Sequence, residues 1–179
     1  MICSISIRSK PSNPNSLPVD AKILHSLARY CAYQERCVQE LHKKMYELGL
    51  LSDDFVEYIG WLTENNYVHE GRFAEIYVRS KFNQKHWGRQ KINFELRKRG
   101  ITEAFIEKAW ESIQETTYSE QLALLIRKKK ASLKTGSGAQ QYQKCVLFAQ
   151  SKGFEINLIH QQVKAIFAED AANPEKRLL

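Results

Sequence analysis

The stretch GRFAEIYVRSKFNQKHWGRQKINFELRKRGI, residues 71–101, decides the fold and carries most of the functional information in the chain. It contains two segments of helical hydrophobic periodicity, separated by a polar and aromatic turn at residues 83–87. It also holds nine Lys or Arg residues against two acids, so its formal charge of +7 equals that of the whole 179-residue chain. A helical unit whose exposed sides are nearly all cationic requires a polyanionic partner or an acidic groove.

Helical periodicity extends on both sides of this stretch. Asp20 is expected to cap a first helix, a second helix is expected from about Gln34 to Leu48, and residues 52–54 are expected to cap a third. A loop is expected at 132–138. Of the other expected helices, two cover residues 72–82 and 88–99, one follows a cap at Thr102 and one begins at Ser119. The last two run from about Gln140 to Lys152 and across Ile159–Phe167.

Three glycines, Gly49, Gly100 and Gly153, are placed to end helices at nearly equal intervals along the chain. Each precedes an apolar residue and a new helix, which predicts three copies of a three-helix unit of about 50 residues. Such units bury enough apolar surface only when they stack. The expected fold is therefore all-α, a curved array of three tandem three-helix repeats. We expect a flexible leader at 1–19, repeats at 20–69, 70–117 (the most basic) and 118–168, and a tail at 169–179.

Short motifs in the central stretch resemble those of one protein family, the RecX regulators of the bacterial recombinase RecA. The matching residues are Arg72-Phe73-Ala74, Tyr77-Val78-Arg79, Trp87-Gly88, Lys91-Ile92, Glu95-Leu96 and Arg97 to Ile101. The resemblance implies an array of three-helix repeats that binds RecA filaments on DNA, single- or double-stranded. It further implies damping of strand exchange, ATP hydrolysis and repressor cleavage in homologous recombination, DNA repair and the SOS response.

The candidate binding residues lie in two basic blocks, at 72–99 and 127–134. In the helix expected at 88–99, Lys91 and Lys98 share one outer flank and Arg97 lies on the other. The scarcity of acids favours a binding surface over a solvated helix face, where the two signs usually alternate. The predicted RecA- or DNA-binding residues are Arg72, Arg79, Lys81, Lys85, Arg89, Lys91, Arg97, Lys98, Arg99, Arg127, Lys128, Lys129, Lys130 and Lys134.

Two aromatic residues are candidate contacts with the partner, and each has a structural alternative. Trp87 could stack on a base, but a Trp beside a helix start more often closes the core between helices. Phe94 points away from the inward residues Ile92 and Leu96, so it either packs on a neighbouring repeat or forms an exposed anchor.

No pattern in the chain indicates catalysis, a metal or a cofactor. The histidines are dispersed, the four cysteines form no CxxC pair, and phosphate-binding and nucleophile motifs are absent. The acids at 53–54 suit a helix start better than acid–base chemistry. No segment reaches the roughly 18 to 20 apolar residues of a membrane span. We expect a non-enzymatic, monomeric, cytoplasmic protein that binds no membrane, metal or cofactor.

Two other functions stay open at this point. The first is an independent DNA-binding protein of helix-turn-helix or architectural type, for which the 88–99 helix offers Arg89, Gln90 and Asn93 as base-reading residues. The second is a helical scaffold that binds an acidic protein in the absence of nucleic acid. Binding to DNA without recombinase, with a steep salt dependence, would distinguish the first of these.

Overall fold

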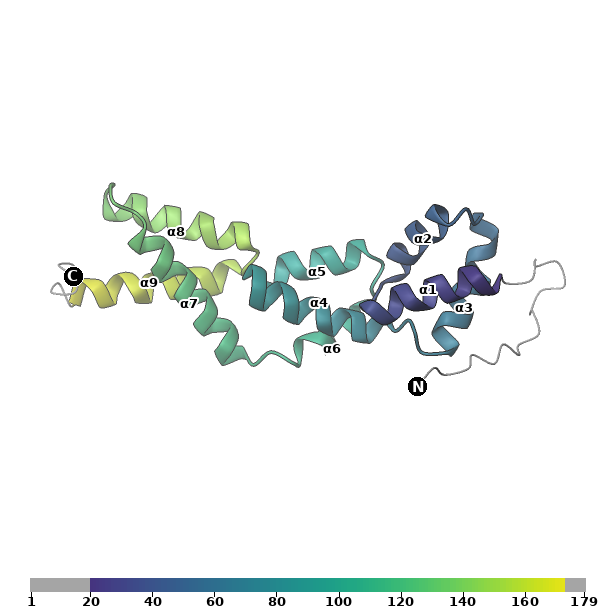
Figure 1. Ribbon diagram of the computed structural model, residues 1–179. Helices are drawn as coiled ribbons and strands as arrows, with labels where there is room; N and C mark the ends of the chain where they lie inside the picture. The colour runs from purple at the N-terminus through teal and green to yellow at the C-terminus, as the bar shows by residue number, and fades with distance from the viewer. Residues whose placement is uncertain (1–19, 173–179) are drawn as a thin grey trace. The chain divides into compact units, whose positions relative to one another are not determined.

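All regular structure in the computed structural model, which describes residues 20–172, is helical (Figure 1). The leader predicted at 1–19 and the tail beyond residue 172 lie outside the described residues. The elements are α1 (Ala21–Tyr33), α2 (Val38–Glu47), the 3-10 turn η1 (Ser52–Asp54), α3 (Phe55–Glu64), α4 (Glu70–Lys85), α5 (Arg89–Lys98), α6 (Glu103–Trp110), α7 (Glu115–Ala131), α8 (Gly138–Lys152) and α9 (Ile156–Ala172). The all-helical prediction is therefore confirmed.

The described residues form two compact units, 20–70 and 71–172. In the first unit, α1, α2 and α3 enclose an apolar core that includes Leu27, Leu41 and Leu62. The Asp20 carboxylate accepts hydrogen bonds from the first-turn amides of α1, as predicted. The Tyr58 hydroxyl accepts another from the Asp20 amide at 2.9 Å, which ties α3 to the start of α1.

The three glycines predicted to end helices all do so in the left-handed region, with φ of 83°, 80° and 87° for Gly49, Gly100 and Gly153. In each case the next residue donates its amide to a carbonyl five residues earlier: Leu50 to Met45, Ile101 to Leu96 and Phe154 to Ala149. This shared closure is what a helical repeat requires, although the predicted repeat boundaries themselves stay a prediction.

Three predicted helix starts are wrong. The second helix, expected from about Gln34, begins at Val38, because Gln34 ends α1 with an extended backbone. Residues 52–54 form a 3-10 turn, and Asp54 has helical backbone angles, so its side chain cannot cap α3. The helix expected from Ser119 begins at Glu115, because the buried Tyr118 supplies an inward residue one turn before Leu122.

Two details near the helix ends were not predicted. Ser137 and Gln140 form a reciprocal capping box that starts α8 at Gly138, inside the expected loop. At the other end of the chain, α9 continues to Ala172, past the predicted start of the tail.

In the second unit, α5 is joined to the C-terminal end of α8. The Gly88 amide donates to the Lys152 carbonyl at 2.8 Å, and the Gln90 amide donates to the Gly153 carbonyl at 3.0 Å. A Cβ atom at Gly88 would lie 2.5 Å from the Phe154 amide nitrogen, so only glycine permits this approach. The contact places the start of α5 at a fixed position on the α8–α9 turn.

Candidate interface for a polyanionic partner

The outer surface of α5 carries three of the predicted bases. Ile92 and Leu96 are fully buried, as predicted, while Arg97 and Lys98 are exposed. Lys91 is half-buried, and its Nζ donates to the Ser151 carbonyl at 3.3 Å. The structure therefore exposes the C-terminal half of α5 more fully than its first turn.

Cations and aromatic rings alternate along α4 and α5 in what we term the cation–aromatic row (Tyr77, Lys81, Trp87, Lys91 and Arg99). The Arg99 guanidinium and the Lys81 ammonium each lie 5.0 Å from the Tyr77 ring centroid. Lys81 and Lys91 lie 5.8 and 4.7 Å from the centroid of Trp87. Because a ring face attracts cations, the rings restrict where these three charges can be.

The two candidate aromatic contacts have different environments. Trp87 is half-buried, with its ring next to the ammonium groups of Lys81 and Lys91, and its backbone amide closes the α4–α5 turn by donating to the Lys81 carbonyl at 3.2 Å. Phe94 is 63% exposed on α5, which decides in favour of the exposed alternative within the described residues.

Several predicted bases pair with carboxylates at the surface. Arg97 makes a two-pronged contact with Glu103, at 2.7 and 2.9 Å, and this hydrogen bonding lowers the pKa of the Glu103 carboxyl. Exposed pairs of this kind add little to stability, so a phosphate or a partner's carboxylate can replace Glu103 at little cost. Arg79–Glu75 at 3.3 Å and Arg127–Glu169 at 2.6 Å are further exposed pairs, whereas the Arg99–Glu95 pair at 2.6 Å is half-buried.

Arg89 has a different environment from the other predicted bases. Its guanidinium lies 5.0 and 4.9 Å from the ring centroids of Trp110 and Tyr118, and it pairs with Glu115 and Glu155. These contacts join α5 to α7 and to the start of α9. Arg89 therefore stabilises the packing of the second unit, and we leave it out of the proposed binding surface.

The basic run at the end of α7 is divided by its helical geometry. Arg127 and Lys128 are exposed, whereas Lys129 and Lys130 are half-buried and lie over the rings of Phe148 and Phe167. Of the remaining predicted bases, Arg72 and Lys81 are half-buried, while Arg79, Lys85 and Lys134 are exposed.

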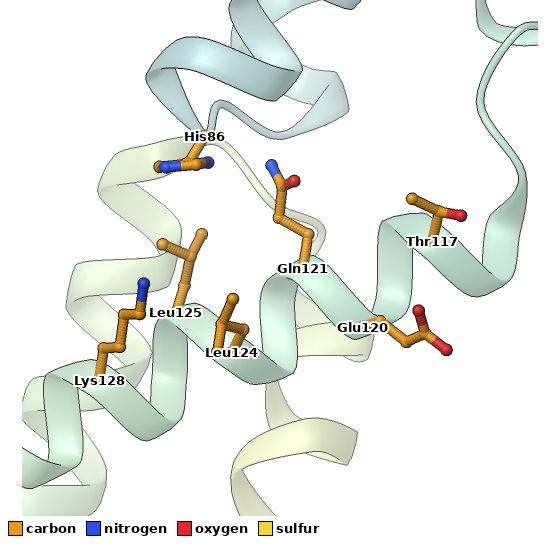
Figure 2. Close-up of a pocket in the computed structure, with 7 residues that line it drawn as sticks. All are labelled: His86, Thr117, Glu120, Gln121, Leu124, Leu125 and Lys128. Carbon is orange, nitrogen blue, oxygen red and sulfur yellow. The ribbon is translucent and has the colours of Figure 1, made fainter.

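A pocket of about 250 Å³ lies between the turn after α4 and one side of α7 (Figure 2). Its lining residues are His86, Thr117, Glu120, Gln121, Leu124, Leu125 and Lys128. Only Lys128 was among the predicted site residues. The six residues from α7 have the three- and four-residue spacing of one helix face, but the sequence does not say that His86, with its left-handed φ of 54°, would face them. This pocket brings Lys128 next to the turn that follows the basic helix α4.

Residues 20–172 contain neither a group of side chains placed to hold a metal ion nor a helix able to span a membrane. In that range no three His, Cys, Asp or Glu side chains are grouped to hold a metal ion. None of the helices between these limits has the length and apolar content to cross a membrane.

The three residues proposed as base readers on α5 are not presented together. Arg89 is held by its carboxylate and aromatic partners, and the Asn93 amide oxygen accepts a hydrogen bond from the Trp110 indole at 2.7 Å. Gln90 alone of the three is exposed. A helix-turn-helix reader requires several such side chains on one accessible face, so this geometry disfavours that alternative.

Comparisons with known proteins agree with this architecture. The family model described as the second three-helix domain of RecX matches residues 70–109. The chain is 28% identical over 130 residues to a regulatory protein RecX of Bacillus cytotoxicus, across 73% of this chain and 48% of that protein. It is 25% identical to the one from Chlorobaculum tepidum over 76% of this chain and 83% of that protein. The match thus spans about half the length of the first relative.

Solved structures extend the likeness to the fold. The crystal structure of RecX from Lactobacillus salivarius superimposes with a TM-score of 0.73 at 24% identity, covering 83% of this chain and 96% of that one. A second RecX crystal structure also gives a TM-score of 0.73, at 23% identity.

Proposed function

This chain belongs to the RecX family of regulatory proteins, and from that membership we propose that it binds RecA filaments on DNA and limits their activity. The activities affected are strand exchange, ATP hydrolysis and the co-protease function of the filament, in the cytoplasm. The chain acts by binding alone, as a monomer, with no covalent chemistry.

The cation–aromatic row is the observation that carries the proposal. Lysine normally loses considerable side-chain freedom when it binds, at a cost of about 0.5–1.5 kcal/mol for each immobilised side chain. Lys81 and Lys91 are already restrained against Trp87, and Arg99 against Tyr77, so much of that freedom is lost before the partner arrives. A row of pre-positioned cations suits an extended anion such as a DNA backbone or an acidic filament groove.

Filament inhibition then follows from occupation of space. With the helical repeats in the filament groove, the bases of α4 and α5 contact DNA phosphates, acidic RecA side chains, or both. Arg97 and Lys98, exposed at the end of α5, would reach farthest into the groove. An occupied groove excludes the incoming duplex, and bridging of successive subunits alters filament growth and disassembly.

Charge reversal on α5 tests this function. The triple variant Lys91→Glu, Arg97→Glu and Lys98→Glu should lose co-sedimentation with RecA–DNA filaments and lose inhibition, because it replaces three attractive charges with repulsive ones. In the wild type, about six engaged phosphates would give a slope near −5 for log affinity against log salt.

The matched control reverses three exposed lysines elsewhere, Lys22, Lys108 and Lys164, to the same final net charge. Circular dichroism should be unchanged in both variants. Full inhibition by the α5 variant would refute the proposal. Binding of the wild type to DNA alone, as tightly as to the filament, would instead favour an independent DNA-binding protein.

Replacement of Trp87 by leucine tests the restraint of the lysines separately from their charge. Without the ring, each lysine must be ordered on binding at a cost of about 0.5–1.5 kcal/mol, so Trp87→Leu should weaken filament binding about 2- to 13-fold for each lysine, with net charge unchanged. Trp61→Leu, at a half-buried tryptophan of the first unit, is the control. Equal affinities of the two variants in a filament-binding titration would show that the ring does not position the lysines.

A further inference from the structure

The pocket beside α7 has a feature that a phosphate-binding surface does not need, an apolar floor. Leu124 is 52% exposed there although most of its neighbours on the helix surface are polar or charged, and Leu125 lies next to it. In Figure 2, Leu125 and Gln121 extend from α7 toward the side on which His86 lies. The Gln121 amide donates to the Phe82 carbonyl at 2.7 Å, which holds this wall of the pocket against the end of α4.

The size of the pocket limits what it can receive. Small-molecule and cofactor sites generally occupy about 300–1,000 Å³ and enclose most of the ligand. This pocket, at about 250 Å³ and open along α7, is below that range. A single apolar side chain presented by another protein fits both its volume and its floor.

The charges around the floor are unequally distributed. Figure 2 shows the Lys128 ammonium extending toward the side occupied by His86, with Leu125 between them, while the Glu120 carboxylate points away. The part of the rim nearest the apolar floor is therefore basic. A partner segment gains most if a carboxylate lies beside its apolar side chain, because the carboxylate then meets Lys128.

We propose that this pocket binds a segment of the recombinase in which one apolar side chain adjoins an acidic residue. The inference rests on the proposed function, and it assigns the protein contact of the filament to α7, separate from the cation–aromatic row on α4 and α5. A DNA backbone is not the occupant, since an apolar floor offers nothing to a phosphate.

The test compares two exposed leucines of the second unit. Leu124→Asp places a charge in the pocket, whereas Leu147→Asp makes the same change on α8, where Leu147 is 57% exposed. Both variants and the wild type are titrated against filaments formed on poly(dT) with a slowly hydrolysed ATP analogue, and against poly(dT) alone. We expect at least 10-fold weaker filament binding for Leu124→Asp, wild-type filament binding for Leu147→Asp, and unchanged binding of both to poly(dT).

A second pair of variants keeps the test independent of folding. Lys128→Glu should weaken filament binding about 10-fold, and Lys144→Glu, at an exposed lysine of α8, should not. A photoreactive benzoylphenylalanine at position 124 should cross-link to recombinase, at an apolar residue next to a carboxylate.

The outcomes separate the two proposals. If the wild type fails to bind the filament, the proposed function is wrong and the pocket assignment fails with it. If the wild type binds and Leu124→Asp binds equally well, the pocket assignment alone is wrong. Equal losses for the α7 and α8 variants, or cross-linking of position 124 to DNA, would also overturn it.

Discussion

Gly88→Ala is expected to destabilise the second unit by about 3 kcal/mol or more. The added methyl would meet the backbone of the α8–α9 turn, at the Gly153 carbonyl and at the Phe154 amide, the latter at 2.5 Å. Backbone cannot move aside as a flexible side chain can. The strain must therefore separate α5 from α8, with loss of the hydrogen bonds from Gly88 to Lys152 and from Gln90 to Gly153.

Denaturant unfolding measures this effect, and the chain offers a matched control. Gly60 lies inside α3, and a methyl added there would have no atom within 4 Å, so Gly60→Ala should stabilise the first unit by about 0.5–1 kcal/mol. Filament binding by Gly88→Ala should fall with stability, because the contact between the start of α5 and the α8–α9 turn positions the basic surface of α5. An unfolding midpoint for Gly88→Ala equal to that of the wild type would show that the close approach is not needed.

Tyr118→Phe is expected to cost about 1–3 kcal/mol at neutral pH. The Tyr118 ring is 1% exposed and packs against Phe82, Trp110 and Phe154. Its hydroxyl accepts the Arg89 amide at 2.8 Å and donates to the Glu155 carboxylate at 2.7 Å. Phenylalanine keeps the packing but leaves the Arg89 amide without its acceptor in a partly buried position.

The same substitution should change how stability depends on alkaline pH. Burial is the main cause that raises the pKa of the Tyr118 phenol far above its ordinary value, and the Glu155 carboxylate raises it further. The unfolded chain releases this proton near pH 10 while the folded protein keeps it. Stability therefore falls above pH 10, by up to about 1.4 kcal/mol per pH unit from this group.

Unfolding free energies measured between pH 8 and pH 11.5 test this expectation. Tyr118→Phe should show a shallower alkaline decline than the wild type, whereas Tyr33→Phe, at a ring 87% exposed, should show the wild-type decline. Some decline should persist in Tyr118→Phe, because burial also raises the pKa of the Cys31 thiol to about 11 and that of the Tyr58 phenol. Parallel curves for wild type and Tyr118→Phe would mean that Tyr118 ionises normally in the folded protein.

Local features of the fold could be predicted because they depend on neighbours in the chain. The inward positions Ile92 and Leu96 follow from a helix period of 3.6 residues, and the helix ends at Gly49, Gly100 and Gly153 follow from a backbone conformation that glycine adopts most easily. The start of α7 was missed because the prediction began the helix at Ser119, although the buried Tyr118 continues the inward face one turn before Leu122.

The candidate site was predicted less well, and Arg89 illustrates the reason. In the sequence it is one base among nine, and nothing local distinguishes it from Lys98. Its two carboxylate partners are Glu115 in α7 and Glu155 just before α9, and they become its neighbours only when those helices pack. The α7 pocket is a similar case, since His86 faces Leu124 only across the packed turn.

The order of residues alone determined the helical fold, the buried faces of its helices and the concentration of positive charge, because each depends on contacts within a few turns of one helix. Packing between helices decided which of those charges are exposed, which are restrained by aromatic rings and which are neutralised by carboxylates from neighbouring helices. Such partners lie tens of residues away along the chain, and a local amino-acid pattern does not specify the distance between them in space.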